Sequence, residues 1–129
     1  MPKTSKETAS NVTQFEGIVD DRFEVLDGYH ISFTSFESDV DGAPLLKGLP
    51  GDQCHCPHWG YVLKGKVGFR FGDREEIYEA GDAFYVPPGH TPFGYAGGEM
   101  VMFQPSDEMA KTVETMKRNM EAAEASAAR

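Results

Sequence analysis

Four cysteine and histidine side chains lie within five consecutive positions near the middle of the chain. They are Cys54, His55, Cys56 and His58, and a further histidine, His90, follows the corner Pro87-Pro88-Gly89. A cysteine thiolate and imidazole nitrogens are the ligands that Zn²⁺ and other late transition metals prefer in proteins. A disulfide between cysteines separated by one residue is strained and links no distant segments, so this spacing indicates metal binding instead.

The parity of these positions suggests which side chains meet. In an extended chain, residues two apart share a face, which puts Cys54, Cys56 and His58 on one side and His55 on the other. The rigid proline corner fixes the direction of His90. We therefore predict that Cys54, His58 and His90 converge on one metal ion, whose fourth position is open or filled by Cys56. Zinc is the favoured ion, and iron, nickel and copper are the alternatives.

Short strands separated by glycine and proline turns would hold these residues. The strands are expected over residues 22–36, 59–63, 66–71, 75–79, 83–86 and 100–103. Strands of this length, with turn residues about every eight to twelve positions, are typical of an all-β sandwich or barrel.

Alternation within the strands predicts which side chains face inward. Positions 29, 31 and 33 are apolar and alternate with the polar positions 30, 32 and 34. We expect the polar set to face outward, so that His30 is exposed and not a ligand. Trp59, Tyr61 and Leu63 have the opposite parity to His58, so they are expected outside the barrel or in a dimer interface.

Two blocks, residues 51–65 and 81–90, carry a glycine and proline skeleton around these ligands. It consists of Tyr61-Val62-Leu63-Lys64-Gly65, Gly81-Asp82, Pro87 and Gly89. The skeleton resembles the two conserved motifs of the cupin superfamily. The resemblance implies a small single-domain cupin of the cupin 2 type, an all-β protein with a double-stranded β-helix, or jelly-roll-like, barrel.

The resemblance also assigns the candidate ligands to motif positions. Cys54 stands where the family has a histidine, and His58 stands where it usually has a glutamate. Pro92 occupies the place of the last family histidine, and His90 lies directly after Gly89 instead. Cys56 has no matching family position. The chain thus looks like a cupin with a variant cysteine and histidine motif.

The resemblance implies a small organic molecule in the barrel pocket, but not which one. Cupins with metal sites include dioxygenases, isomerases and decarboxylases, and the fold alone does not fix the reaction. An open metal position favours such an enzyme. Four protein ligands would favour a module that holds a metal or ligand without chemistry. A metal-free, dimerising scaffold is the third alternative.

The two ends of the chain differ from the barrel region. Residues 1–14 are polar and are expected to form a flexible arm before a barrel over residues 15–105. Residues 106–129 form the third segment, with an amphipathic helix expected from about Asp107 to Ala123. Its apolar stripe of Met109, Val113, Met116 and Met120 would pack on the barrel or on a partner, which favours a homodimer.

Composition excludes several classes of partner. A net charge of -9 argues against nucleic acid, because phosphate binding needs a basic surface. The sequence has no apolar run of the length that crosses a membrane, about 18 residues or more. The N-terminus lacks the apolar stretch of a secretory signal, so a cytoplasmic protein is expected.

Overall fold

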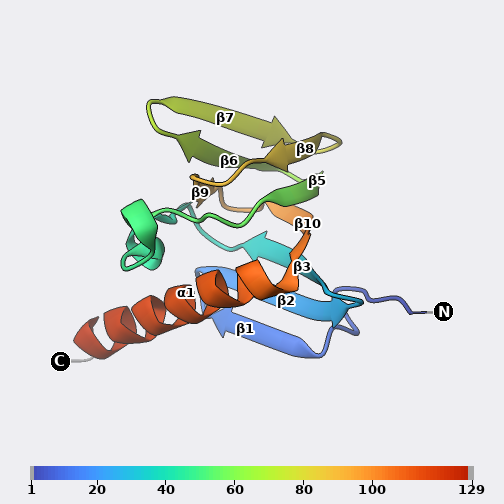
Figure 1. Ribbon diagram of the computed structural model, residues 1–129, viewed down its shortest axis with the longest axis horizontal. Coiled ribbons are helices and arrows are strands. Elements are labelled where there is room, and N and C mark those ends of the chain that lie inside the picture. The colour runs from blue at the N-terminus through green and yellow to red at the C-terminus, as the bar shows by residue number, and fades with distance from the viewer. Residues whose placement is uncertain (1, 128–129) are drawn as a thin grey trace.

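The computed structural model describes residues 2–127, which form two antiparallel sheets and one long C-terminal helix (Figure 1). The strands are β1 (Asn11–Phe15), β2 (Val19–Leu26), β3 (Tyr29–Phe36), β4 (Val40–Asp41), β5 (His58–Lys64), β6 (Lys66–Phe71), β7 (Arg74–Glu79), β8 (Ala83–Val86), β9 (Thr91–Gly94) and β10 (Glu99–Pro105). Two short 3₁₀ helices, η1 (Ala43–Leu46) and η2 (Pro50–Asp52), precede β5, and α1 (Ser106–Ala127) ends the described chain. The predicted all-β architecture with a C-terminal helix is confirmed.

The sheets bring together strands that are far apart in the sequence. Six strands follow the order β1-β2-β3-β10-β5-β8, and four follow the order β4-β9-β6-β7. The apolar core lies between the two sheets and includes Val62 of β5, Phe69 of β6, Phe84 of β8 and Met100 of β10. Among the candidate ligands, His58 begins β5 in the six-stranded sheet and His90 directly precedes β9 in the four-stranded sheet, so the two histidines approach from different sheets.

The first hairpin differs from the single strand expected over residues 22–36. Asp27 and Gly28 both have positive φ, 49° and 81°, and they form the two-residue turn between β2 and β3. Such turns match the twist of antiparallel strands, and Asp-Gly is a preferred pair for them. Strand β1 pairs with β2 over Asn11–Phe15, so the last four residues of the expected arm, 11–14, all belong to the sheet.

The orientation expected for β3 is wrong. His30, Ser32 and Thr34 are buried on the inner face of the sheet, while Tyr29 is 53% exposed on the outer face. The alternation was therefore real, but the polar set faces inward. An interior that contains a cavity accommodates polar groups that a solid apolar core would exclude.

Helix α1 covers one end of the barrel. Its first turn contains Asp107 and Glu108, and their negative charges interact favourably with the positive end of the helix dipole. It extends beyond the expected end at Ala123, and residues 128–129 lie outside the described chain. Helix α1 packs against η1, β3 and β10, and in Figure 1 it passes in front of β1 and β2. No helix within residues 2–127 is long and apolar enough to cross a membrane.

The helix is held on the barrel by polar and apolar contacts. The Nδ2 of Asn119 donates hydrogen bonds to the carbonyls of Leu45 and Lys47, at 2.7 and 2.9 Å. Met109 and Met120 are buried on the same side of the helix. The apolar stripe of α1 therefore faces the barrel of its own chain.

Candidate metal centre

Three of the predicted ligands meet inside the barrel. The potential ligand atoms of Cys54, His58 and His90 all lie within 4.8 Å of one another, and all three residues are buried. Cys54 Sγ lies 3.6 Å from His58 Nε2, and the ring centroids of His58 and His90 are 4.8 Å apart. A soft sulfur and two imidazoles at this separation form a donor set suited to a late transition metal.

The backbone around Cys54 places it opposite His90. Cys54 N–H donates to the His90 carbonyl at 2.9 Å, and His90 N–H donates back to the Cys54 carbonyl at 3.1 Å. This pair is an isolated antiparallel bridge, because β5 begins only at His58. Residues 54–57 are therefore not a strand. Cys54 reaches the cluster through its bridge to His90.

Both histidines present the same free nitrogen to the cluster. His58 Nδ1 donates to Gln104 Oε1 at 2.8 Å, and His90 Nδ1 donates to the Pro87 carbonyl at 2.7 Å. With the proton on Nδ1, the lone pair is on Nε2 in each ring. His90 Nε2 is buried and has no hydrogen-bond partner among the described residues. Histidines that ligate metals are commonly oriented by a hydrogen bond from the other ring nitrogen.

Gln104 of β10 is a residue that the sequence analysis missed. It is fully buried, and its Nε2 donates to His30 Nδ1 at 2.7 Å and to Ser32 Oγ at 3.3 Å. Its Oε1 accepts the hydrogen bond from His58, so its side-chain hydrogen bonds are all made with buried groups. A lone glutamine in a strand gives no sequence signal for this role, since its partners lie on other strands.

Burial controls the protonation of the cluster. Burial, together with the neighbouring imidazole of His90, lowers the pKa of His58 to about 3, and burial lowers the pKa of His90 to about 4. Both rings are thus neutral near pH 7, the form that binds a metal. Burial raises the pKa of the Cys54 thiol. A coordinated metal reverses this tendency, because it displaces the thiol proton.

The structure does not bring Cys56 or His55 to the cluster. Cys56 is buried against the end of β10, where its Sγ lies 3.6 Å from the Pro57 carbonyl and 3.9 Å from that of Pro105. Burial raises the pKa of its thiol to about 12. His55 is exposed, and its Nε2 lies 2.6 Å from the carbonyl of Pro50. Both thiols are free.

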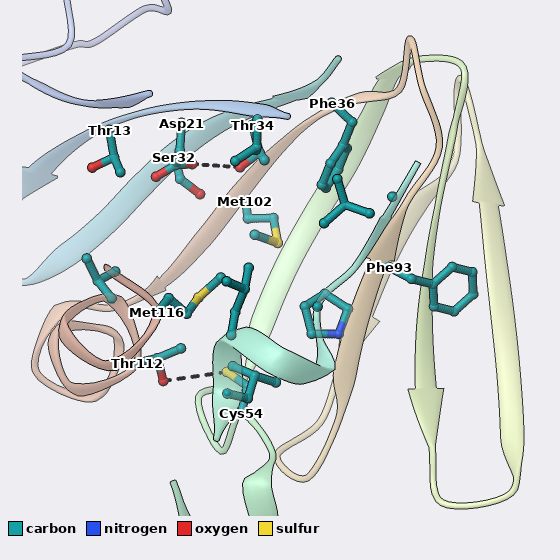
Figure 2. A pocket seen from close by; sticks show the side chains of 18 of the residues that line it. Thr13, Asp21, Ser32, Thr34, Phe36, Cys54, Phe93, Met102, Thr112 and Met116 are labelled. Atoms are coloured by element: carbon teal, nitrogen blue, oxygen red, sulfur yellow. Dashed lines mark hydrogen bonds between the residues drawn. The ribbon is translucent and has the colours of Figure 1, made fainter. Parts of the chain in front are cut away.

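A cavity of about 130 Å³ opens onto the cluster. Cys54, His58 and His90 form part of its wall, and α1 contributes Thr112 and Met116. Figure 2 shows Cys54 and Thr112 linked at one end of the pocket, with the sulfurs of Met102 and Met116 beyond them. The side of the cluster that lacks a protein ligand therefore faces a space large enough for a small molecule.

The far wall of this cavity is polar. Thr13 of β1, Asp21 of β2, and Ser32 and Thr34 of β3 line it, and Thr34 Oγ1 donates to Asp21 Oδ1 at 2.7 Å. Burial raises the pKa of Asp21 to about 6. His30, which the sequence predicted to be exposed, is on the same strand. It is only 2% exposed, and it stacks on Phe23 with the ring centroids 4.2 Å apart.

Comparison with known proteins gives a consistent fold. The family model described as "Cupin domain" matches residues 53–104. An RmlC-like cupin from Shewanella frigidimarina has a TM-score of 0.56 at 16% identity, with 79% of this chain and 87% of that chain covered. No curated protein matches the sequence.

Two further solved structures are similar. A cupin superfamily protein from Desulfitobacterium hafniense has a TM-score of 0.55 at 17% identity and covers 72% of this chain and 82% of its own. The polyketide cyclase RemF from Streptomyces resistomycificus has a TM-score of 0.56 at 17% identity, with 81% and 80% covered. At these identities the likeness shows the fold.

Proposed function

Because this chain is a small cupin-domain protein, we propose that Cys54, His58 and His90 hold a divalent transition metal, at which a small organic molecule binds from the cavity. The orientation of the two histidines carries the proposal. Each ring gives its Nδ1 proton to a protein acceptor, and His90 Nε2 is left buried without a partner among the described residues. A metal ion satisfies that nitrogen, which otherwise costs free energy.

The donor set favours zinc. One thiolate and two imidazoles match a catalytic type of zinc site, in which three protein ligands leave a position for water or substrate. Iron, nickel and copper stay as alternatives, since imidazole also suits them. Bound here, the metal would supply Lewis-acid polarisation of a ligand oxygen or activation of a water molecule. A reducing compartment such as the cytoplasm suits the site, because Cys54 binds only as a free thiolate.

The placement of Cys56 supports an open site. Its sulfur faces backbone carbonyls at the end of β10, and the free side of the cluster faces the cavity. In a closed four-ligand zinc site, the sulfur of Cys56 would have to occupy the coordination position that here faces the cavity. Binding of an external molecule at the metal is thus favoured over a purely structural role.

A non-catalytic ligand-binding module is the second candidate, and the surroundings of the cluster favour it. Among the described residues, the cluster's hydrogen-bonding neighbours are the amide of Gln104, the hydroxyl of Thr112 and backbone carbonyls. None of these groups is a general base at neutral pH. Turnover would then need the metal itself, or the substrate, to move the proton.

Elemental analysis tests the proposal directly. Protein purified without added metal is expected to carry about one transition-metal ion per chain, because three ligands bind tightly in a preformed site. His55→Ala serves as the matched control and keeps the ion, since His55 is exposed and faces away from the cluster. A metal content near zero, even after incubation with Zn²⁺ and Fe²⁺, would contradict the proposal.

We also propose a homodimer, through a different surface from the one the helix stripe suggested. The outer face of β10, β5 and β8 exposes Phe103, Trp59 and Tyr85, which are 44%, 50% and 48% exposed. They lie side by side, with Phe103 opposite Trp59 and the Trp59 and Tyr85 rings 5.0 Å apart. Sedimentation equilibrium of the wild type and Trp59→Lys checks this: the wild type sediments as a dimer and the variant as a monomer.

A further inference from the structure

A second polar group lies in the cavity, away from the metal ligands. Thr13, Asp21 and Thr34 are opposite one another on β1, β2 and β3, and the next partner in this row is the apolar Met100. All four line the cavity. Asp21 is thus a carboxylate placed among hydroxyl and apolar side chains, on an inner wall where carboxylates are costly.

The carboxylate of Asp21 is only partly satisfied. Thr34 Oγ1 donates to its Oδ1 at 2.7 Å, and Oδ2 has no hydrogen-bond partner among the described residues. No lysine, arginine or histidine in residues 2–127 forms an ion pair with it. Its neighbour Asp20, in contrast, is bound by Arg22 Nε at 2.9 Å. Asp21 therefore keeps an acceptor oxygen for a group that enters the cavity.

The two polar ends of the cavity are separated by a mainly apolar stretch, in which Ser32 of β3 lies opposite Met102. Gln104, which holds His58, is opposite His30 on β3, and Thr34 lies four residues further along the same strand. At the usual rise of a strand, these levels are about 13 Å apart. Figure 2 shows Asp21 and Thr34 at one side, Cys54 at the other, and the methionines Met102 and Met116 between them.

We propose that Asp21 and Thr34 form a second subsite, which binds an amino or hydroxyl group of a small molecule whose other end reaches the Cys54–His58–His90 cluster. This inference rests on the proposed function for its metal-binding end. It defines the ligand class as a molecule with a metal-binding head, a short apolar chain and a hydrogen-bond donor at the tail. Apolar walls with a few polar groups at defined points are the usual design of such pockets.

Alkyl hydroxamates of equal chain length test the subsite in the metal-loaded protein. The hydroxamate head binds the metal, and the tails differ only in ending with a methyl or an amino group. The amino-tailed probe is expected to bind about tenfold more tightly, since a charge-assisted hydrogen bond contributes more than a neutral one. Asp21→Asn should remove most of this preference, and Asp20→Asn, the adjacent control, should keep it. Equal affinities of the two probes for the wild type would overturn the subsite.

A second measurement tests the subsite if the protein binds no metal and therefore no hydroxamate. Metal-free protein is titrated with n-butylamine while the methyl NMR signals of Thr34 and Met102 are followed. Saturable shifts in the wild type that are absent from Asp21→Asn support the subsite even though the metal proposal has failed. The absence of shifts in the wild type overturns it.

Discussion

Gln104 Oε1 accepts a hydrogen bond from His58 Nδ1 at 2.8 Å, between two side chains that are both buried in the barrel. The bond fixes the tautomer of His58 and turns its Nε2 toward Cys54 Sγ. The same amide donates to His30 and Ser32, so its orientation is determined from both ends. One amide thereby connects the polar inner face of β3 to the candidate metal centre.

The first prediction concerns this amide. Gln104→Leu should weaken metal binding by about 10–100-fold, the usual effect of losing a partner that orients a ligand. Gln104→Glu should bind within a few-fold of the wild type, because its carboxylate still accepts from His58 while His30 and Ser32 can donate to it. Competition with a chromophoric chelator measures both affinities. Identical affinities for the leucine variant and the wild type would remove Gln104 from the site.

The second prediction separates ligands from bystanders. His58→Ala and His90→Ala should each abolish stoichiometric metal, since removal of one of three ligands leaves a weak site. Cys56→Ala should retain about one ion per chain, because its sulfur faces Pro57 and Pro105. Elemental analysis of the purified variants gives the answer. Loss of metal from Cys56→Ala would instead indicate a fourth protein ligand.

The third prediction uses the pKa of His30. Burial lowers it from 6.5 to about 4 in the folded protein, so below pH 6.5 the unfolded chain binds a proton that the folded chain does not. The folded state therefore loses stability as the pH falls from 6.5 to 4, by about 3 kcal/mol from this group.

His30→Asn isolates that contribution. Its Oδ1 can accept the Gln104 hydrogen bond, and it does not titrate. Urea unfolding at pH 7 and pH 4.5 should show a smaller acid loss for the variant than for the wild type. Equal losses would mean that His30 does not stay neutral in the fold.

The fourth prediction concerns packing inside the sheet. A Cβ at Gly60 of β5 would collide with the ring of Phe84 on the neighbouring strand β8. Gly60→Ala should therefore destabilise the protein by about 1–3 kcal/mol, the typical cost of overpacking. Gly72→Asn is the control, because that turn has open space and a positive φ that asparagine tolerates. Thermal unfolding of both variants checks the difference.

The sequence was sufficient for the strands that turn at glycine and proline. The expected strands at 66–71 and 83–86 have the bounds of β6 and β8, since Gly65, Gly72, Gly81 and Pro87 mark their ends. Outward-facing Trp59, Tyr61 and Leu63 were also placed correctly, because β5 is regular from His58 onward. Local signals of this kind need no knowledge of the partner strand.

The faces of β3 could not be assigned by the same reasoning. Alternation shows that two faces differ, and the usual assumption sends the polar face to water. In this barrel the polar face lines the interior, so His30, Ser32 and Thr34 were misplaced. The parity argument for Cys56 depended on an extended chain from 54 to 58, whereas that segment makes one bridge at Cys54 before β5 begins. Gln104 acts only through cross-strand contacts, which no local pattern contains.

The two hydrogen bonds from Asn119 to the carbonyls of Leu45 and Lys47 have a consequence for the rates at which the cavity binds and releases its contents. Helix α1 forms one wall of the cavity, so we expect that weakening its attachment speeds the exchange of a ligand or a metal ion with solvent. Asn119→Ala should leave the final occupancy of the site almost unchanged while shortening the residence time of whatever it holds. Binding at the site would then reach equilibrium faster, and its selectivity would depend less on slow dissociation of the bound ligand or metal.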